Sequence, residues 1–222
     1  MAAALVLAAT AGCGSKNRAH PVPPNGVASV AFVARVDNPW FPLTPGATLR
    51  YTGETDGVPG FDVFAVTHDT KRILGVTATV VHDRVILRGR LAEETLDYYA
   101  QDARGNVWYL GEDTKELDRH GQVKSRSGTW RAGVDGARAG IFMPAHPRVG
   151  QSFRQEYYKG EADDHFRVVR IDGDRLITNE WTPLEPGVLD AKFYKRGIGT
   201  ILEVTLKGGD ERWALKKVQT AR

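Results

Sequence analysis

Short segments in which apolar and polar residues alternate, separated by turns rich in Gly and Asp, run from residue 47 to residue 218. Leu49 and Tyr51, for example, alternate with Thr48, Arg50 and Thr52. A period of two residues is typical of a β-strand with one buried face, and no stretch of helical length shows an apolar stripe with a period of 3.6. The expected strands are 47–54, 61–68, 72–88, 94–101, 106–112, 115–118, 123–125, 128–132, 152–158, 165–171, 175–181, 191–195, 199–207 and 211–218, with a short helical turn within 134–142.

Hairpin turns such as 102–105 and 208–210 join many of these segments. Roughly a dozen short antiparallel strands predict an all-β fold, either a sandwich or a barrel. Their regular spacing favours an antiparallel meander curled into a single barrel or half-barrel. Three prolines in residues 37–46 exclude a helix there, and we expect Trp40 and Phe41 to plug one end of the core.

The N-terminal residues resemble a bacterial lipoprotein export signal. An apolar run at 5–9 is followed by small residues at 10–12 and then by Cys13, the single cysteine of the chain. This pattern predicts a signal peptide over 1–12, a lipidated, Pro-rich tether over 13–30 and a β-barrel domain over 31–222. The mature protein is then exported to the cell envelope, with Cys13 anchoring it to a membrane. Secretion without a lipid, or an ordinary small-residue N-terminus, are the alternatives.

Composition and motif searches exclude several classes of protein. The net charge is +3 with basic and acidic residues interspersed, so no nucleic-acid partner is expected. A single cysteine excludes a Cys-based zinc site, and the histidines lack the spacing of a zinc motif. Nucleotide-binding and serine-hydrolase motifs are absent from the sequence, so neither an organic cofactor nor a metal is expected. The acids of 160–165, with Glu112, Asp113 and Glu116, could supply oxygen ligands to Ca²⁺ but lack the usual loop pattern.

Four strings of this sequence are familiar as a set: DNPWFPL at 37–43, GEDTKE at 111–116, MPAHPRVG at 143–150 and EWTPLEPG at 180–187. Together they resemble a family of uncharacterised bacterial exported proteins and lipoproteins, for which the resemblance implies no activity. The predicted architecture also resembles, more distantly, the curled-sheet lipoprotein carriers of the LolA and LppX kind. That second likeness concerns the fold and is a weak guide to function.

One hairpin is the best candidate for a functional site. If 102–105 is a four-residue loop, Tyr99 lies opposite Trp108, Asp97 opposite Leu110 and Thr95 opposite Glu112. One face of the hairpin then combines rings with carboxylates, as a site for a polar ligand does. We therefore predict that Tyr99, Trp108, Asp97 and Glu112 bind a ligand. The alternative is that these acids pair with arginines near the barrel rim, namely Arg50, Arg84 or Arg154.

Two further positions are candidates. Arg154 and Glu156 alternate with apolar residues in 153–158 and are predicted to add charges to the same pocket. His146 lies between two prolines, which fix its direction and suit a general base, although a histidine that caps a rigid loop is the simpler interpretation. The five tryptophans either fill the core and the barrel ends or line a cavity.

These features favour a membrane-tethered barrel that binds a small amphipathic or lipidic ligand and performs no chemistry. A curled sheet of this size leaves either a packed interior or a pocket, and inward-facing rings and acids favour the pocket. The first alternative is a cofactor-free hydrolase, lyase or isomerase in which Asp97 and Glu112 form a carboxylate pair and His146 is the base. The second is an interaction module that docks on an envelope complex.

Overall fold

The computed structural model describes residue 27 and residues 29–220, which form sixteen β-strands and no helix. The predicted signal peptide and Cys13 lie outside the described residues. Within them, no helix is long and apolar enough to cross a membrane. The strands are β1 (Phe32–Val33), β2 (Thr48–Thr55), β3 (Val58–Ile73), β4 (Val76–Leu87), β5 (Arg90–Asp102), β6 (Val107–Leu117), β7 (Val123–Ser125), β8 (Trp130–Arg131), β9 (Arg138–Met143), β10 (Ser152–Arg154), β11 (Glu156–Tyr157), β12 (His165–Asp172), β13 (Arg175–Trp181), β14 (Leu189–Lys195), β15 (Gly199–Lys207) and β16 (Arg212–Gln219).

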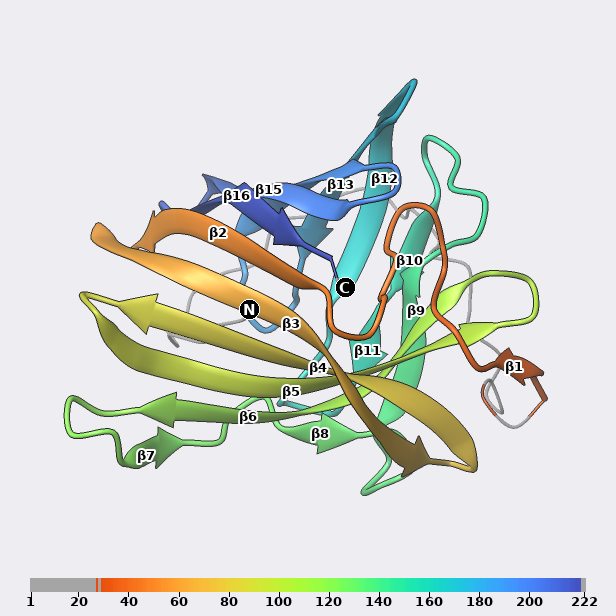
Figure 1. Cartoon of the computed structure of the whole chain (residues 1–222), viewed down its shortest axis with the longest axis horizontal. Coiled ribbons are helices and arrows are strands. Elements are labelled where there is room, and N and C mark those ends of the chain that lie inside the picture. The colour runs from red at the N-terminus through yellow and green to blue at the C-terminus, as the bar shows by residue number, and fades with distance from the viewer. Residues whose placement is uncertain (1–26, 28, 221–222) are drawn as a thin grey trace.

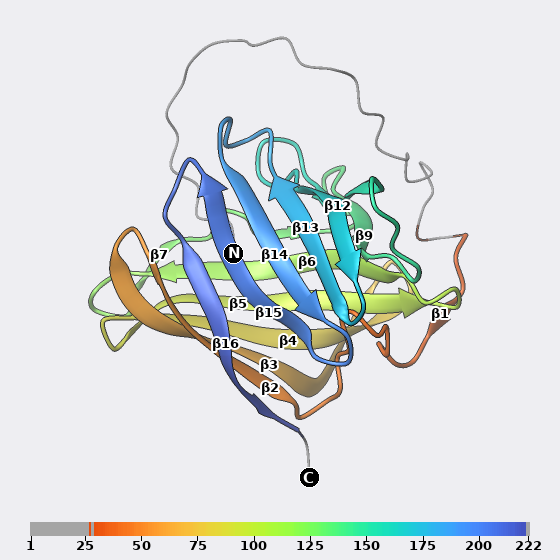
Figure 2. The same cartoon turned by 90° about the horizontal axis from the view of Figure 1, so that it is seen from above.

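All strands belong to one antiparallel sheet that curls into a nearly closed barrel (Figures 1 and 2). Its order is β10-β12-β13-β14-β15-β16-β2-β3-β4-β5-β6-β9-β11, and β1, β7 and β8 pair at its margins. The first and last strands of this path, β10 and β11, are consecutive in the chain and are separated by Gln155 alone. The backbone itself therefore joins the two edges of the sheet. The all-β meander predicted from the sequence is confirmed.

The join of the two edges depends on close backbone contact at Gly140 in β9. A Cβ atom at this position would lie 2.2 Å from the carbonyl oxygen of Arg154 and 2.5 Å from that of Gln155. Such distances are far below van der Waals contact, so only glycine lets β9 approach the segment that closes the barrel.

Two of the local predictions were wrong. Residues 72–88 are not one strand, because β3 and β4 are separated by a tight turn at Leu74 and Gly75, whose φ angles are 48° and 80°. A two-residue hairpin turn with positive φ at both positions matches the twist of the strands that it joins. Leucine is uncommon at such a position, so the sequence at Leu74 gave little indication of a turn. The segment 134–142 holds no helical turn: 138–143 is β9, which pairs with β6 and β11.

The barrel has two ends that differ in their cover. Residues 37–46 cross one end, which we call the plug end. Asn38 Nδ2 donates hydrogen bonds to the carbonyl oxygens of Gly105 (2.8 Å) and Pro144 (3.2 Å), and the Gly197 amide donates to the Pro39 carbonyl (2.6 Å). Trp40 and Phe41 are 2% and 4% exposed, as predicted for a plug. The turns at 56–57, 88–89, 182–188 and 208–211 lie at the opposite end, the loop end.

Candidate functional site

An internal cavity of about 410 Å³ lies inside the barrel, which is within the size range of small-molecule sites. Buried and half-buried residues of β2–β6 and β14–β16, with Phe41 and Leu43 of the plug, surround it. Its lining also includes exposed residues at the loop end, among them Ser127, Gly160 and Leu184. The cavity therefore reaches the surface at the loop end, while the plug segment closes the other.

Aromatic rings line the part of the cavity nearest the plug. The ring centroid of Phe41 lies 4.5 Å from that of Phe142 and 5.2 Å from that of Tyr99. Tyr99 in turn stacks on Tyr109 at 4.8 Å, and Phe64 meets Phe41 edge-on at 6.0 Å. These rings form a continuous apolar surface at the closed end.

Carboxylates line the cavity closer to the loop end. We call the acidic wall the side chains at inward positions of four adjacent strands: Asp62 of β3, Asp83 of β4, Glu93 and Asp97 of β5, and Glu112 of β6. Pairing sets these positions because Asp97 lies directly opposite Glu112, and Val85, two residues after Asp83, lies opposite both Asp62 and Glu93. The wall thus concentrates negative charge on one side of the cavity.

Burial keeps much of this charge suppressed near neutral pH. Desolvation, and then repulsion from Asp83, raise the pKa of Asp97 to about 7, although Tyr109 Oη donates a 2.5 Å hydrogen bond to Asp97 Oδ1. Desolvation, and then repulsion from Asp97, raise the pKa of Glu112 to about 8. Burial likewise raises the pKa of Glu93. The acidic wall therefore holds protons that an exposed carboxylate would have lost.

Two oxygens of the cavity acids lack an N–H group or hydroxyl as donor in the described structure. Asp62 is 6% exposed, yet its Oδ1 has no such donor, and neither does Oδ1 of Asp83. Burial, the charge of Asp83 and a side-chain hydrogen bond with Asp83 raise the pKa of Asp62 well above its usual range. Buried acceptors without a donor are costly, and in native proteins they call for an explanation.

Lys192 is the single basic side chain among the described residues that line the cavity. Its Nζ lies 3.0 Å from Glu180 Oε2 and 3.4 Å from Glu203 Oε1. Burial lowers the pKa of Lys192, but the charges of Glu180 and Glu203 outweigh burial and raise it. Glu180 Oε1 also accepts hydrogen bonds from Thr178 Oγ1 (3.0 Å) and Tyr194 Oη (3.3 Å). We call Thr178, Glu180, Lys192, Tyr194 and Glu203 the lysine cluster, in which the positive charge is already compensated.

The register predicted for the hairpin of β5 and β6 was wrong, and different residues lie opposite each other in the structure. Asp102 and Asn106 pair at its end, since the Asp102 amide donates to the Asn106 carbonyl (2.9 Å), which leaves a loop of 103–105 instead of 102–105. A bulge follows between Tyr98 and Tyr99. These two shifts place Asp97 opposite Glu112 and Tyr99 opposite Tyr109. Tyr99, Asp97 and Glu112 line the cavity, as does Thr95.

Trp108 does not line the cavity, contrary to the predicted register. It pairs with Ala100, and its indole Nε1 donates a hydrogen bond to Asp102 Oδ2 (3.0 Å). The shorter loop moves Trp108 to the other face of β6, where it packs edge-on against Phe32 at 6.1 Å. Its contacts are structural.

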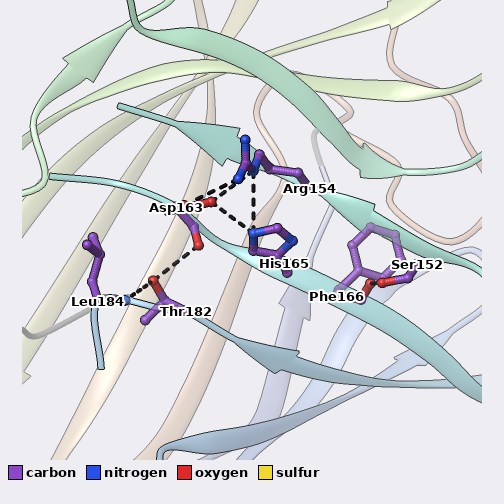
Figure 3. Close-up of polar contacts among 7 residues, drawn as sticks. All are labelled: Ser152, Arg154, Asp163, His165, Phe166, Thr182 and Leu184. Atoms are coloured by element: carbon purple, nitrogen blue, oxygen red, sulfur yellow. Dashed lines mark hydrogen bonds and ion pairs between the residues drawn. The ribbon is translucent and has the colours of Figure 1, made fainter. Parts of the chain in front are cut away.

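Glu156 lines the cavity but Arg154 does not. The chain bends between β10 and β11, so Gln155 and Glu156 both face inward. Arg154 Nε lies 2.9 Å from Asp163 Oδ1, and His165 Nε2 lies 2.8 Å from the same oxygen (Figure 3). This cluster lies beside the cavity and uses the charge of Arg154 locally. Within the described residues, no arginine forms an ion pair with Asp97 or Glu112.

His146 lies away from the acidic wall. It lines a second pocket, of about 390 Å³, together with Asn38, Trp40, Arg104 and Arg196. Trp40 faces this pocket while the adjacent Phe41 faces the cavity, so the plug segment separates the two. The structure therefore does not bring His146 together with Asp97 and Glu112.

Three of the acids proposed for calcium, Asp113, Glu116 and Asp163, are engaged in ion pairs. Arg131 Nη2 lies 3.4 Å from Asp113, Lys124 Nζ 3.5 Å from Glu116, and Arg154 2.9 Å from Asp163. No group of three or more ligating side chains in the described part of the chain is placed to hold a metal ion.

The sequence interpretation missed Asp62, Asp83, Glu93 and Lys192. A signal for them was present, because Asp62 precedes the inward-facing Phe64 by two positions and Asp83 follows the buried Val81 by two. Continuing the alternation along each strand would have placed these charges inside the barrel.

No protein-family model matches this chain, and no curated protein matches it. Matching solved structures include a protein from Bacteroides fragilis described as exported and as having a YmcC-like fold. It is 13% identical, with a TM-score of 0.44 over 86% of this chain and 100% of that one. A protein from Parabacteroides distasonis described as a lipoprotein is 7% identical, with a TM-score of 0.39 over 81% and 97% of the two chains. Similarity at this level carries no argument about function.

Proposed function

We propose that this protein is an exported, membrane-tethered binding protein of the cell envelope that holds one small amphipathic molecule inside its barrel. The observation that carries the proposal is the cavity of about 410 Å³. It is closed and aromatic at the plug end, and acidic and continuous with the surface at the loop end. A molecule with an apolar part and a polar part matches this division if its apolar part lies deepest.

Binding is favoured over the enzyme alternative by the placement of the candidate residues. The enzyme alternative combines the carboxylate pair Asp97 and Glu112 with His146 as the base. His146, the predicted base, lies in another pocket across the plug segment. The geometry thus supports a ligand site more directly than a reaction.

Native mass spectrometry of the protein purified without denaturant tests the proposal. The expected result is a retained ligand, or uptake of added decanol in a ratio of one to one. Thr200→Trp places an indole inside the cavity and is expected to abolish either signal. Thr52→Trp is the matched control, because Thr52 is exposed on the outer face of β2. Equal binding by both variants would show that the ligand lies elsewhere.

Membrane tethering is proposed from the sequence of residues 5–13. Cys13→Ala removes the thiol that takes the lipid, so the variant is expected in the soluble fraction of lysed cells. Ser15→Ala, two residues away, is the control and is expected to remain with the membranes. If Cys13→Ala also fractionates with membranes, the proposed anchor is wrong.

A further inference from the structure

Given the proposed binding function, we propose that the polar group of the bound amphiphile is a protonated amine held against the acidic wall. The four strands β3–β6 direct their carboxylates to one side of the cavity, as described above. The proposal concerns the chemical class of the ligand and depends on three independent features of the cavity.

The first feature is the set of acceptors without donors. Oδ1 of Asp62, in a side chain that is 6% exposed, and Oδ1 of Asp83 have no N–H group or hydroxyl as donor in the described structure. Asp62 forms a hydrogen bond with Asp83, which requires a proton on one of the two carboxyls. Once that proton is displaced both carboxylates only accept hydrogen bonds, so they need a group that donates. An ammonium group donates three hydrogen bonds and also supplies the opposite charge.

The second feature is the imbalance of charge. Lys192 is the one basic side chain in the described lining, and Glu180 and Glu203 already compensate it at 3.0 and 3.4 Å. The acidic wall has no such partner among the described residues, so its repulsion is relieved by bound protons instead. A ligand ammonium can replace those protons, and an anionic ligand would increase the repulsion.

The third feature is the position of the wall relative to the rings. Asp62 pairs across the sheet with Tyr51 and Val85 near the loop end, whereas Tyr99 pairs with Thr79 and Tyr109 nearer the plug. An alkyl or aromatic tail among Phe41, Tyr99 and Phe142 would bring a terminal amine close to the carboxylates. A bare metal ion fits less well, because no described group of ligating side chains is arranged to hold one.

Isothermal titration calorimetry with four soluble ten-carbon probes tests the inference: decylamine, decyltrimethylammonium, decanol and decanoate, at pH 8 and below their micelle concentrations. We expect decylamine to bind at least about tenfold more tightly than decanol, because its ammonium group makes charge-assisted hydrogen bonds to the carboxylates. Decyltrimethylammonium has the charge without N–H donors and is expected to be weaker than decylamine. Decanoate is expected to be weakest.

The outcomes separate this inference from the proposed function. If decanol or decanoate binds as tightly as decylamine, the amine assignment is wrong while amphiphile binding stands. If decyltrimethylammonium equals decylamine, the assignment to an N–H donor is wrong. If none of the four probes binds, the proposed function itself fails.

A double variant of the acidic wall tests where in the cavity the amine binds. The double variant Asp97→Asn/Glu112→Gln replaces two ionisable carboxyls with amides of the same size, and is expected to weaken decylamine at least about tenfold and leave decanol within about twofold. Glu54→Gln, exposed on the outer face of β2, is the control and is expected to change neither affinity. Equal losses for decylamine and decanol, or no loss for decylamine, would overturn the placement of the amine at the acidic wall.

Discussion

The acidic wall and the lysine cluster bury the same chemical groups on different parts of one barrel. In the lysine cluster, Glu180 and Glu203 share Lys192, and Glu180 accepts further hydrogen bonds from Thr178 and Tyr194. In the acidic wall, Asp62 and Asp83 each keep an oxygen without an N–H group or hydroxyl as donor. Removing the cation from a buried ion pair is costly, so the lysine cluster is expected to stabilise the fold. The acidic wall lacks a cation among the described residues, and in the proposal above a ligand amine supplies it.

The largest predicted effect comes from removing the cation of the lysine cluster, which leaves its acids uncompensated like those of the acidic wall. Lys192→Met leaves Glu180 and Glu203 buried without a cation and is expected to reduce the free energy of unfolding by about 3–5 kcal/mol at pH 8. The loss is expected to shrink at pH 5, because Glu180, whose pKa burial raises, then takes up a proton. Urea denaturation at both pH values measures it, with the exposed Lys217→Met as control. A loss below about 1 kcal/mol at pH 8 would show that the lysine cluster is not structural.

The next largest effect is expected from the acidic wall, whose carboxylates make the folded protein less stable as pH rises. The pKa values of Asp97 and Glu112 are raised to about 7 and about 8, so the folded state binds more protons than the unfolded state between these values and their usual range. Stability from these groups is fully present at low pH and is lost as pH rises toward 8. The wild-type free energy of unfolding is expected to fall by about 2 kcal/mol or more from pH 5 to pH 8.

Asp97→Asn/Glu112→Gln removes these titrations and sharpens the test. The double variant is expected to be about 2 kcal/mol more stable than wild type at pH 8 and to show a flatter pH profile. A gain of stability together with a loss of decylamine binding would mark the wall as a functional site. Destabilisation of the variant at pH 8 would contradict the comparison, since it would mean that these carboxylates stabilise the fold.

The sequence predicted the all-β barrel because alternation with Gly and Asp turns is repeated along the whole domain, and local errors do not change the class. Which of the predicted site residues line the cavity depends on the register of the β5–β6 hairpin. Asp97 and Glu112 line the cavity, but a three-residue loop and the bulge at Tyr98–Tyr99 moved Trp108 to the other face. Neither the loop length nor the bulge changes the alternation of polar and apolar residues from which the register was predicted. The position of His146 depends on how the plug segment crosses the barrel, which is set by long-range hydrogen bonds from Asn38.

The smallest predicted effect comes from comparing two aromatic residues of β6, Trp108 outside the cavity and Tyr109 in its lining. Trp108→Phe removes the 3.0 Å hydrogen bond to Asp102 and is expected to reduce the free energy of unfolding by about 1 kcal/mol. Decylamine affinity is expected to remain unchanged, because Trp108 faces away from the cavity. Tyr109→Phe is the matched variant on the inward face: it removes the hydrogen bond to Asp97, raises the pKa of Asp97 further and is expected to weaken decylamine at pH 7. Weaker decylamine binding in Trp108→Phe than in Tyr109→Phe would mean that the register places the wrong ring in the cavity.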